Sequence, residues 1–73
     1  MNIRTLVIAR RSGFYVLAAR PGGTTTSPGG AIIVDVRSAV NPDGEFLHFT
    51  ARDEAQRWAD SVTTWDPAQW STY

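Results

Sequence analysis

The chain of 73 residues contains no cysteine, no lysine and only one histidine, His48. Without cysteine, neither a disulfide bond nor a thiolate metal site can stabilise the fold, and one histidine cannot build a zinc site alone. A domain of this size buries only about 60% of the surface of its unfolded chain. Small scaffolds without such supports commonly gain core by oligomerising. We therefore expect a homodimer without cofactor or metal.

The chain also lacks an excess of either charge, because seven arginines balance seven acidic residues. Proteins that contact nucleic acid directly normally carry a basic excess, since phosphate neutralisation supplies much of their affinity. No apolar run approaches the roughly 20 residues needed to span a bilayer, and the N-terminus lacks the apolar region of a signal peptide. We expect a soluble, cytoplasmic protein that does not bind membranes.

All seven basic residues are arginine. Arginine has GC-rich codons, whereas lysine has only AT-rich ones. The composition therefore indicates a GC-rich genome, such as that of an actinomycete or one of its phages.

Three apolar segments predict strands. Residues 3–9 and 14–19 predict an antiparallel hairpin with apolar side chains on both faces. Residues 31–37 alternate, so that Ile32, Val34 and Val36 share one face, which we expect to be core. The opposite face presents Asp35 and Arg37, which could pair with polar groups on a neighbouring strand.

The connection at residues 21–30 holds four glycines and two prolines, which predicts a mobile loop. Asn41-Pro42-Asp43-Gly44 predicts a tight turn between the third strand and a fourth at residues 45–49, giving a second hairpin. On that fourth strand we expect Phe46 and His48 to point one way, and Leu47 and Phe49 the other.

Thr50 is placed to cap a helix that runs to about Thr63, with Asp53 near the capping-box position and within reach of Arg57. The apolar positions of this helix follow helical spacing, and its main anchor is Trp58. The predicted fold is α+β. Residues 1–63 form a small antiparallel four-stranded sheet of two hairpins packed by one C-terminal amphipathic helix, and residues 64–73 form an aromatic tail.

The tail carries Trp65, Trp70 and Tyr73. Asp66 followed by Pro67 predicts the start of a single helical turn. Because large aromatic side chains rarely stay solvated without purpose, we expect these three to cover the second face of the sheet, or to bind a partner.

Candidate chemistry is sparse. His48 is the one side chain that titrates near neutral pH when unperturbed, but its place on a strand favours a structural role over catalysis. No serine lies in a recognised nucleophile motif. Arg10 and Arg11, with Tyr15 near them, are the best candidates for contact with nucleic acid, and Arg4 could add to them. An ordinary solvated turn explains the same residues. We expect a protein that is not an enzyme.

The order of strand, turn, strand and helix resembles the domain-of-unknown-function 397 family, which includes BldB-like actinomycete regulators. The similarity lies in Val34-Asp35-Val36-Arg37-Ser38, in the turn Asn41-Pro42-Asp43-Gly44 and in Phe46-Leu47-His48-Phe49-Thr50. It covers residues 9–62. Ala9 departs from the tryptophan that the family usually has there.

The resemblance implies a small non-enzymatic regulator that acts through protein contacts, often beside a helix-turn-helix transcriptional repressor. It brings no catalytic residues. The alternatives are a phage-encoded inhibitor that binds a host protein, and a small nucleic-acid-binding protein that uses Arg10 and Arg11.

Overall fold

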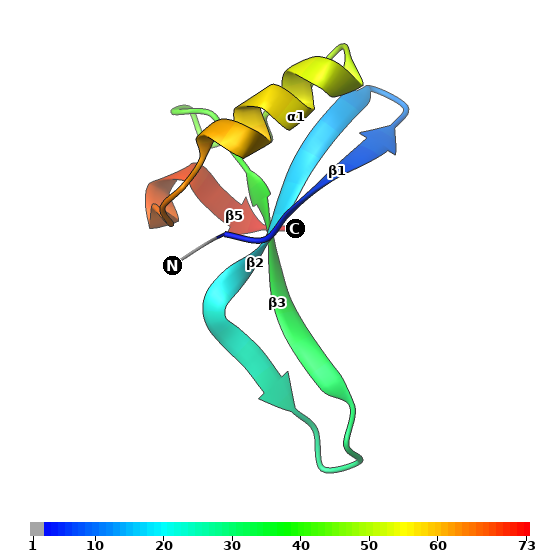
Figure 1. Ribbon diagram of the computed structural model, residues 1–73, viewed down its shortest axis with the longest axis vertical. Coiled ribbons are helices and arrows are strands. Elements are labelled where there is room, and N and C mark those ends of the chain that lie inside the picture. The colour runs from blue at the N-terminus through cyan, green and yellow to red at the C-terminus, as the bar shows by residue number, and fades with distance from the viewer. Residues whose placement is uncertain (1–2) are drawn as a thin grey trace.

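The computed structural model describes residues 3–73, which form one antiparallel sheet with a helix across one of its faces (Figure 1). The sheet order is β1-β2-β3-β5, and β4 also pairs with β2. The α+β class is confirmed, with five strands instead of four. The elements are β1 (Thr5–Arg10), β2 (Gly13–Thr26), β3 (Ile32–Ala39), β4 (His48–Phe49), α1 (Arg52–Ser61), the 3-10 helix η1 (Pro67–Gln69) and β5 (Trp70–Thr72).

The first hairpin forms as predicted. Two residues separate β1 from β2, and the register joins Arg10 to Gly13. Gly13 has φ +138°, and an added Cβ would lie 2.6 Å from the carbonyl oxygen of Phe49. Only glycine fits this position, because other residues would meet both the dihedral strain and the collision.

The glycine-rich segment differs from the prediction over its first half. Strand β2 continues to Thr26 and pairs again with β3 after a bulge between Ala19 and Thr24. Only residues 27–31 form the turn, which is closed by a 2.8 Å hydrogen bond from the backbone N–H of Ser27 to the carbonyl of Ala31. The prediction of a mobile loop over 21–26 was wrong, because three consecutive threonines favour a strand and the glycines are absorbed by the bulge. Residues 20–35, which we call the arm, project away from the helix (Figure 1).

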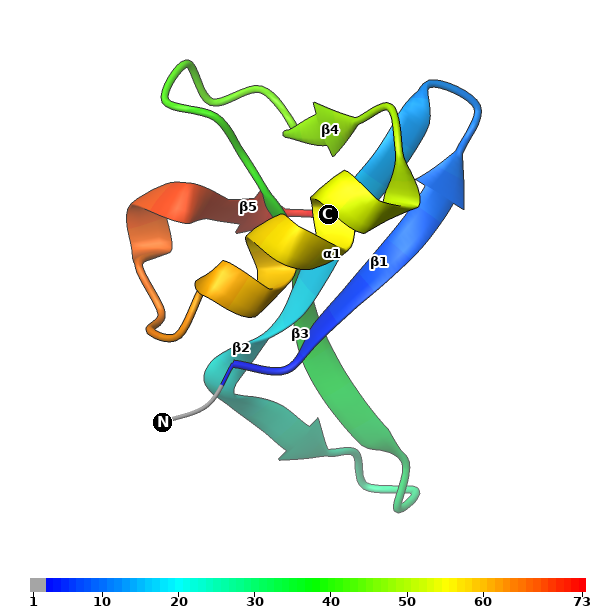
Figure 2. The same ribbon diagram turned by 45° about the horizontal axis from the view of Figure 1, so that its top comes forward.

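The predicted turn at Asn41 is confirmed. The Asn41 side chain accepts hydrogen bonds from the backbone N–H groups of Asp43 and Glu45, both at 3.0 Å, and Gly44 takes φ +85°. The predicted second hairpin is confirmed only at its turn end. An antiparallel bridge joins Val40 to Phe46, with backbone hydrogen bonds from Asn41 to Glu45 (2.8 Å) and from Leu47 to Ala39 (2.9 Å) on either side of it. The following residues, β4, then pair with β2 beyond the end of β3 instead of continuing along β3 (Figure 2). Residues 40–47 are therefore an excursion between two segments that both pair with β2.

The C-terminal residues complete the sheet. Asp66 caps η1 by accepting a 3.0 Å hydrogen bond from the backbone N–H of Ala68, as the Asp-Pro pair predicted. Strand β5 then pairs with the end of β3, joining Trp70 to Ala39 and Thr72 to Arg37. The tail is thus an edge strand of the sheet.

Helix α1 packs on β1, β2 and β4. Its small buried side chains, Ala55 and Ala59, allow close approach to the strands, and Trp58 packs against the core beside them. Its N-cap is Ala51, without a side-chain hydrogen bond, so the predicted Thr50 cap was wrong. The helix ends at Ser61, two residues before the predicted Thr63, and no ion pair joins Asp53 to Arg57.

The core lies between α1 and one face of the sheet. The strand side chains on this face are Val7 from β1, Val16 and Ala18 from β2, Ala39 from β3 and Trp70 from β5. The register therefore places Ile32, Val34 and Val36 on the opposite face, where they are exposed. The prediction that these three are core was wrong, because alternation shows which residues share a face but not which face the helix covers. Phe49 of β4 and Leu47 just before it pack against the core, as the alternation over 45–49 predicted.

Candidate interaction surface

No helix within residues 3–73 packs on the second face of the sheet, which we call the open face. Leu6 is 62% exposed there, and Val36 39%. Cross-strand pairing makes the surface continuous, since Leu6 faces Leu17, and Ala19 faces Val36. By the strand register, the side chains on the open face are Arg4 just before β1, Leu6, Ile8 and Arg10 on β1, Tyr15, Leu17 and Ala19 on β2, Val34, Val36 and Ser38 on β3, and Ser71 and Tyr73 at β5. Leu17 is only 9% exposed and Ser38 is fully buried, so the exposed aliphatic side chains of this face include Leu6, Val34 and Val36.

A pocket of about 380 Å³ lies at the turn end of the open face, and we call it the Tyr73 pocket. It joins two sets of residues that the sequence singled out separately. Arg10, Arg11 and Tyr15 line it together with Tyr73 from the tail, and Phe46 forms a further wall. The guanidinium of Arg10 lies 5.3 Å from the centre of the Tyr73 ring, and Tyr15 shares a hydrogen bond with Ser12. Aromatic rings therefore form the walls of the pocket, and guanidinium groups lie at its rim.

Tyr73 is half exposed in this pocket, whereas the two tail tryptophans lie on the other side of the sheet. Trp70 is 4% exposed, stacks on Trp65 with ring centres 5.3 Å apart, and meets Trp58 edge-on at 5.8 Å. We call Trp58, Trp65 and Trp70 the tryptophan cluster. Burial makes Trp70 a core residue, so it cannot serve as the surface contact that the sequence suggested. Nor do the two tryptophans cover the second face, as we had expected of the tail.

The arm exposes apolar side chains on both of its faces. Ile32 is 73% exposed and Ile33 53%. Strand β5 pairs only with Arg37 to Ala39, so the outer backbone edge of β3 from Ile32 to Val36 lacks a partner strand among residues 3–73. Free edges of this kind pair readily with another chain.

Charged side chains meet at the base of the arm. Asp35 accepts hydrogen bonds from the Nε atoms of Arg20, at 2.6 Å, and Arg37, at 3.0 Å. The hydrogen bond from Arg37, followed by that from Arg20, lowers the pKa of Asp35 to about 2, because both favour the charged carboxylate. The ion pair expected between strand three and a neighbouring strand is therefore present, and it joins the two strands of the arm where β2 is bulged.

His48 lies on the same side as Tyr15, with ring centres 5.9 Å apart, and it is exposed. No salt bridge joins it to a carboxylate of the described chain. Residues 3–73 also contain no group of three metal-binding side chains.

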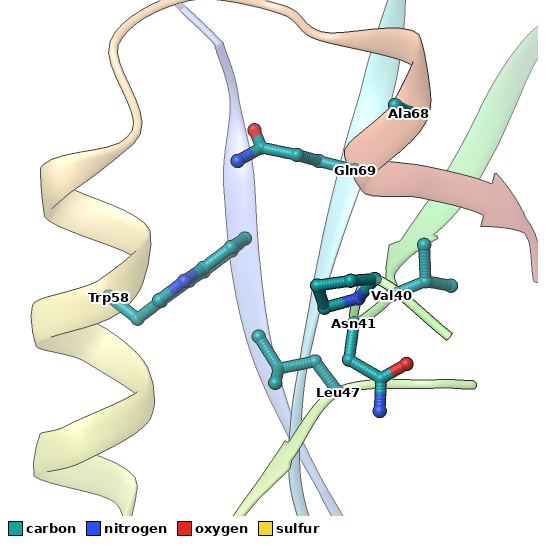
Figure 3. A pocket seen from close by; sticks show the side chains of 7 residues that line it. Val40, Asn41, Leu47, Trp58, Ala68 and Gln69 are labelled. Carbon is teal, nitrogen blue, oxygen red and sulfur yellow. The ribbon is translucent and has the colours of Figure 1, made fainter. Parts of the chain in front are cut away.

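A second pocket, of about 360 Å³, lies on the helix side between α1, the excursion and η1. Trp58 reaches into it from α1, Gln69 from η1, and Leu47 and Val40 from the opposite wall (Figure 3). No titratable side chain lines it, and the nearby Asn41 side chain is already hydrogen-bonded to the backbone of its own turn. The lining of this pocket therefore holds no group suited to acid–base catalysis.

The chain matches no protein-family model, no curated protein and no solved structure. No helix of the described part is long and apolar enough to cross a membrane.

Sequence reasoning missed Phe46 and Tyr73 as neighbours of Arg10, because their contact depends on where the excursion and β5 return to the sheet. It had marked Tyr73 and Arg10 as candidates for different functions. The contact depends on the pairing of β5 with β3. A strand of three residues is too short to show an alternating pattern, so the sequence does not predict this pairing.

Proposed function

We propose that the protein is a non-enzymatic, cytoplasmic module for protein–protein interaction, with a regulatory role and a homodimeric state. The observation that supports this most is the open face, where Leu6 of β1 and Val34 and Val36 of β3 are exposed around the largely buried Leu17 of β2. Large contiguous apolar patches on a soluble domain are typical of interaction sites.

The homodimer forms through the arm. The free edge of β3 offers unpaired N–H and C=O groups from Ile32 to Val36, and an antiparallel copy of the same edge supplies the complementary set through a two-fold axis. Within this stretch no lysine or proline blunts the edge. The one charge, Asp35, is held by Arg20 and Arg37.

Analytical ultracentrifugation of the full chain tests the dimer. The parent is expected to sediment as a dimer whose population rises with concentration, and Val34→Lys should be monomeric, because it places a charge in the middle of the paired edge. The matched control is Ala31→Lys, at the turn outside this edge. A parent that is monomeric throughout, or a V34K protein that dimerises as well as the parent, contradicts the proposal.

The regulatory role extends the resemblance to the domain-of-unknown-function 397 family. The partner class it suggests is a helix-turn-helix repressor encoded nearby, and a phage inhibitor of a host protein has the same physical requirements. Gene neighbourhood separates the two: an adjacent repressor gene supports the first and adjacent virion genes the second. Co-purification of the repressor product with the tagged chain tests the first directly.

Nucleic-acid binding is the second candidate, because Arg10, Arg11 and Tyr15 lie together in the Tyr73 pocket. Such binding falls steeply with salt. A mobility shift at low salt that Arg10→Gln with Arg11→Gln abolishes supports it, and no shift at low salt ends it.

A further inference from the structure

The charged side chains that the described residues place on the open face are all arginines, whereas the acidic side chains and the other four arginines lie elsewhere. The open face carries Arg4 and Arg10 at opposite ends of β1, with Arg11 at the adjoining turn. No acidic side chain of residues 3–73 lies on it by the strand register. The acidic residues are elsewhere: Asp35 on the opposite face of β3, Asp43 and Glu45 in the turn, Asp53, Glu54 and Asp60 on α1, and Asp66 at η1.

Each end of the open face is hollowed beside an arginine. The Tyr73 pocket, at Arg10, is one hollow. The other, of about 270 Å³, has Leu6, Leu17 and Val36 around it and Arg4 at its rim. The two arginines are six positions apart along extended chain, which corresponds to about 20 Å. The surface thus repeats one combination, an apolar hollow with a cation beside it, at two places.

We propose that the open face binds an acidic amphipathic helix of a protein partner, with an apolar side chain in each hollow and carboxylates beside Arg4 and Arg10. A helix completes the layer that the fold leaves open, since α1 already covers the other face in this way. The distance between the two arginines corresponds to about 13 residues of helix. This inference rests on the proposed interaction function and names its partner chemistry.

Other occupants fit the same surface less well. A second copy placed face to face would bring only arginines together across the contact. Single-stranded nucleic acid needs aromatic rings on which successive bases stack. Away from the turn end the open face is aliphatic, with Leu6, Leu17 and Val36 around the second hollow, and its tyrosines are confined to the turn end.

The test is to add a designed 16-residue amphipathic peptide to the isotopically labelled full chain and to monitor the amide signals of the chain by NMR. Its apolar stripe is leucine and tryptophan, and its polar face is glutamate. The matched peptide has lysine in place of every glutamate. We expect the acidic peptide to shift the amide signals of Leu6, Leu17, Val36 and Tyr73, and the basic peptide to leave them in place.

Replacement of Arg10 and Arg11 by glutamine should lower the affinity of the protein for the acidic peptide about tenfold, because two exposed ion pairs are lost. Arg57→Gln, on the exposed side of α1, should leave the affinity unchanged. Equal binding of both peptides, shifts confined to α1, or competition by oligothymidine at equal concentration overturns the inference. Sedimentation reports the dimer separately, so failure here with an intact dimer removes the acidic helix and leaves the proposed function standing.

Discussion

Replacement of Trp70 by alanine tests whether the tail is part of the core. Trp70 is 4% exposed and contacts both other members of the tryptophan cluster. Truncation of a buried tryptophan to alanine costs about 3–5 kcal/mol. A domain of 73 residues has a total free energy of unfolding of about 4–11 kcal/mol. The variant should therefore lose between about a quarter of its stability and all of it.

Urea denaturation followed by far-UV circular dichroism measures this loss without relying on tryptophan fluorescence. With a urea dependence of about 1 kcal/mol per molar, the midpoint should fall by about 3 M or more. Trp65→Ala is the matched control, because Trp65 is only partly buried and pairs with Trp70 alone among the tryptophans. Loss of one aromatic pair and some apolar area should lower its midpoint by about 1–2 M. Trp70→Phe keeps a ring in the core and supplies an intermediate value if the alanine variant does not fold.

The test is the order of the urea midpoints of the three proteins. The parent should exceed Trp65→Ala, which should exceed Trp70→Ala. If both alanine variants unfold at the parental midpoint, the cluster does not stabilise the domain, and the two tryptophans are available for a partner after all.

Three further predictions concern single side chains. Ser38 is fully buried and its Oγ has no hydrogen-bond partner, so Ser38→Ala should leave the free energy of unfolding, measured by urea denaturation, unchanged or raise it by up to about 1 kcal/mol; a clear loss of stability would contradict this. The pKa of Asp35 in the folded state is about 2, below its ordinary value of 3.8, so its contribution to stability is complete above about pH 4 and is lost as the pH falls through 2. Asp35→Asn should therefore flatten the decline of thermal stability between pH 4 and pH 2, and an unchanged slope would show that the ion pairs at the arm contribute nothing. Ala51→Asp should stabilise the protein by about 1 kcal/mol in thermal melts, because Ala51 is the uncapped N-cap of α1, whereas Thr50→Ala should have little effect; the reverse order would restore Thr50 as the cap.

Local signals in the sequence predicted several elements well. The first hairpin, the Asn41 turn and the Asp66 cap each follow from a few adjacent residues whose conformational preferences agree. Alternation also separated Phe46 and His48 from Leu47 and Phe49 correctly. These features need no knowledge of what lies on either side of the sheet.

Non-local choices could not be predicted in the same way. The side chains at Ile32, Val34 and Val36 are apolar enough for a core, and only the position of α1 decides that they face solvent. The helix packs where Val7, Val16 and Ala18 meet small alanines at Ala55 and Ala59, and bulkier neighbours would hold it away. Likewise the pairing of β4 with β2 depends on the whole excursion at 40–47, not on the turn within it.

Only part of the Tyr73 pocket could be predicted, because the rest depends on non-local contacts. Its arginines and Tyr15 are adjacent in the chain and were recognised together, whereas Phe46 and Tyr73 arrive from segments more than thirty residues away. The sequence alone does not indicate that Arg10 lies over the Tyr73 ring, because it suggests a different role for each of the two residues.

The way β5 joins the sheet explains why one face is closed by the chain itself and the other is not. A strand sends successive side chains to opposite faces, so a short strand carrying Trp70 at its start can commit that ring to only one side. It goes to the helix side, where Trp58 and Trp65 complete a packed cluster, and the residues that follow offer the open face only Ser71 and Tyr73. The tail therefore closes an edge and thickens an existing core without adding cover to Leu6, Val34 or Val36. Apolar side chains that stay in solvent add little to the stability of the fold, because they are not removed from water on folding, whereas a contiguous patch of them is typical of an interaction surface; this is the physical reason to look for the partner on that face.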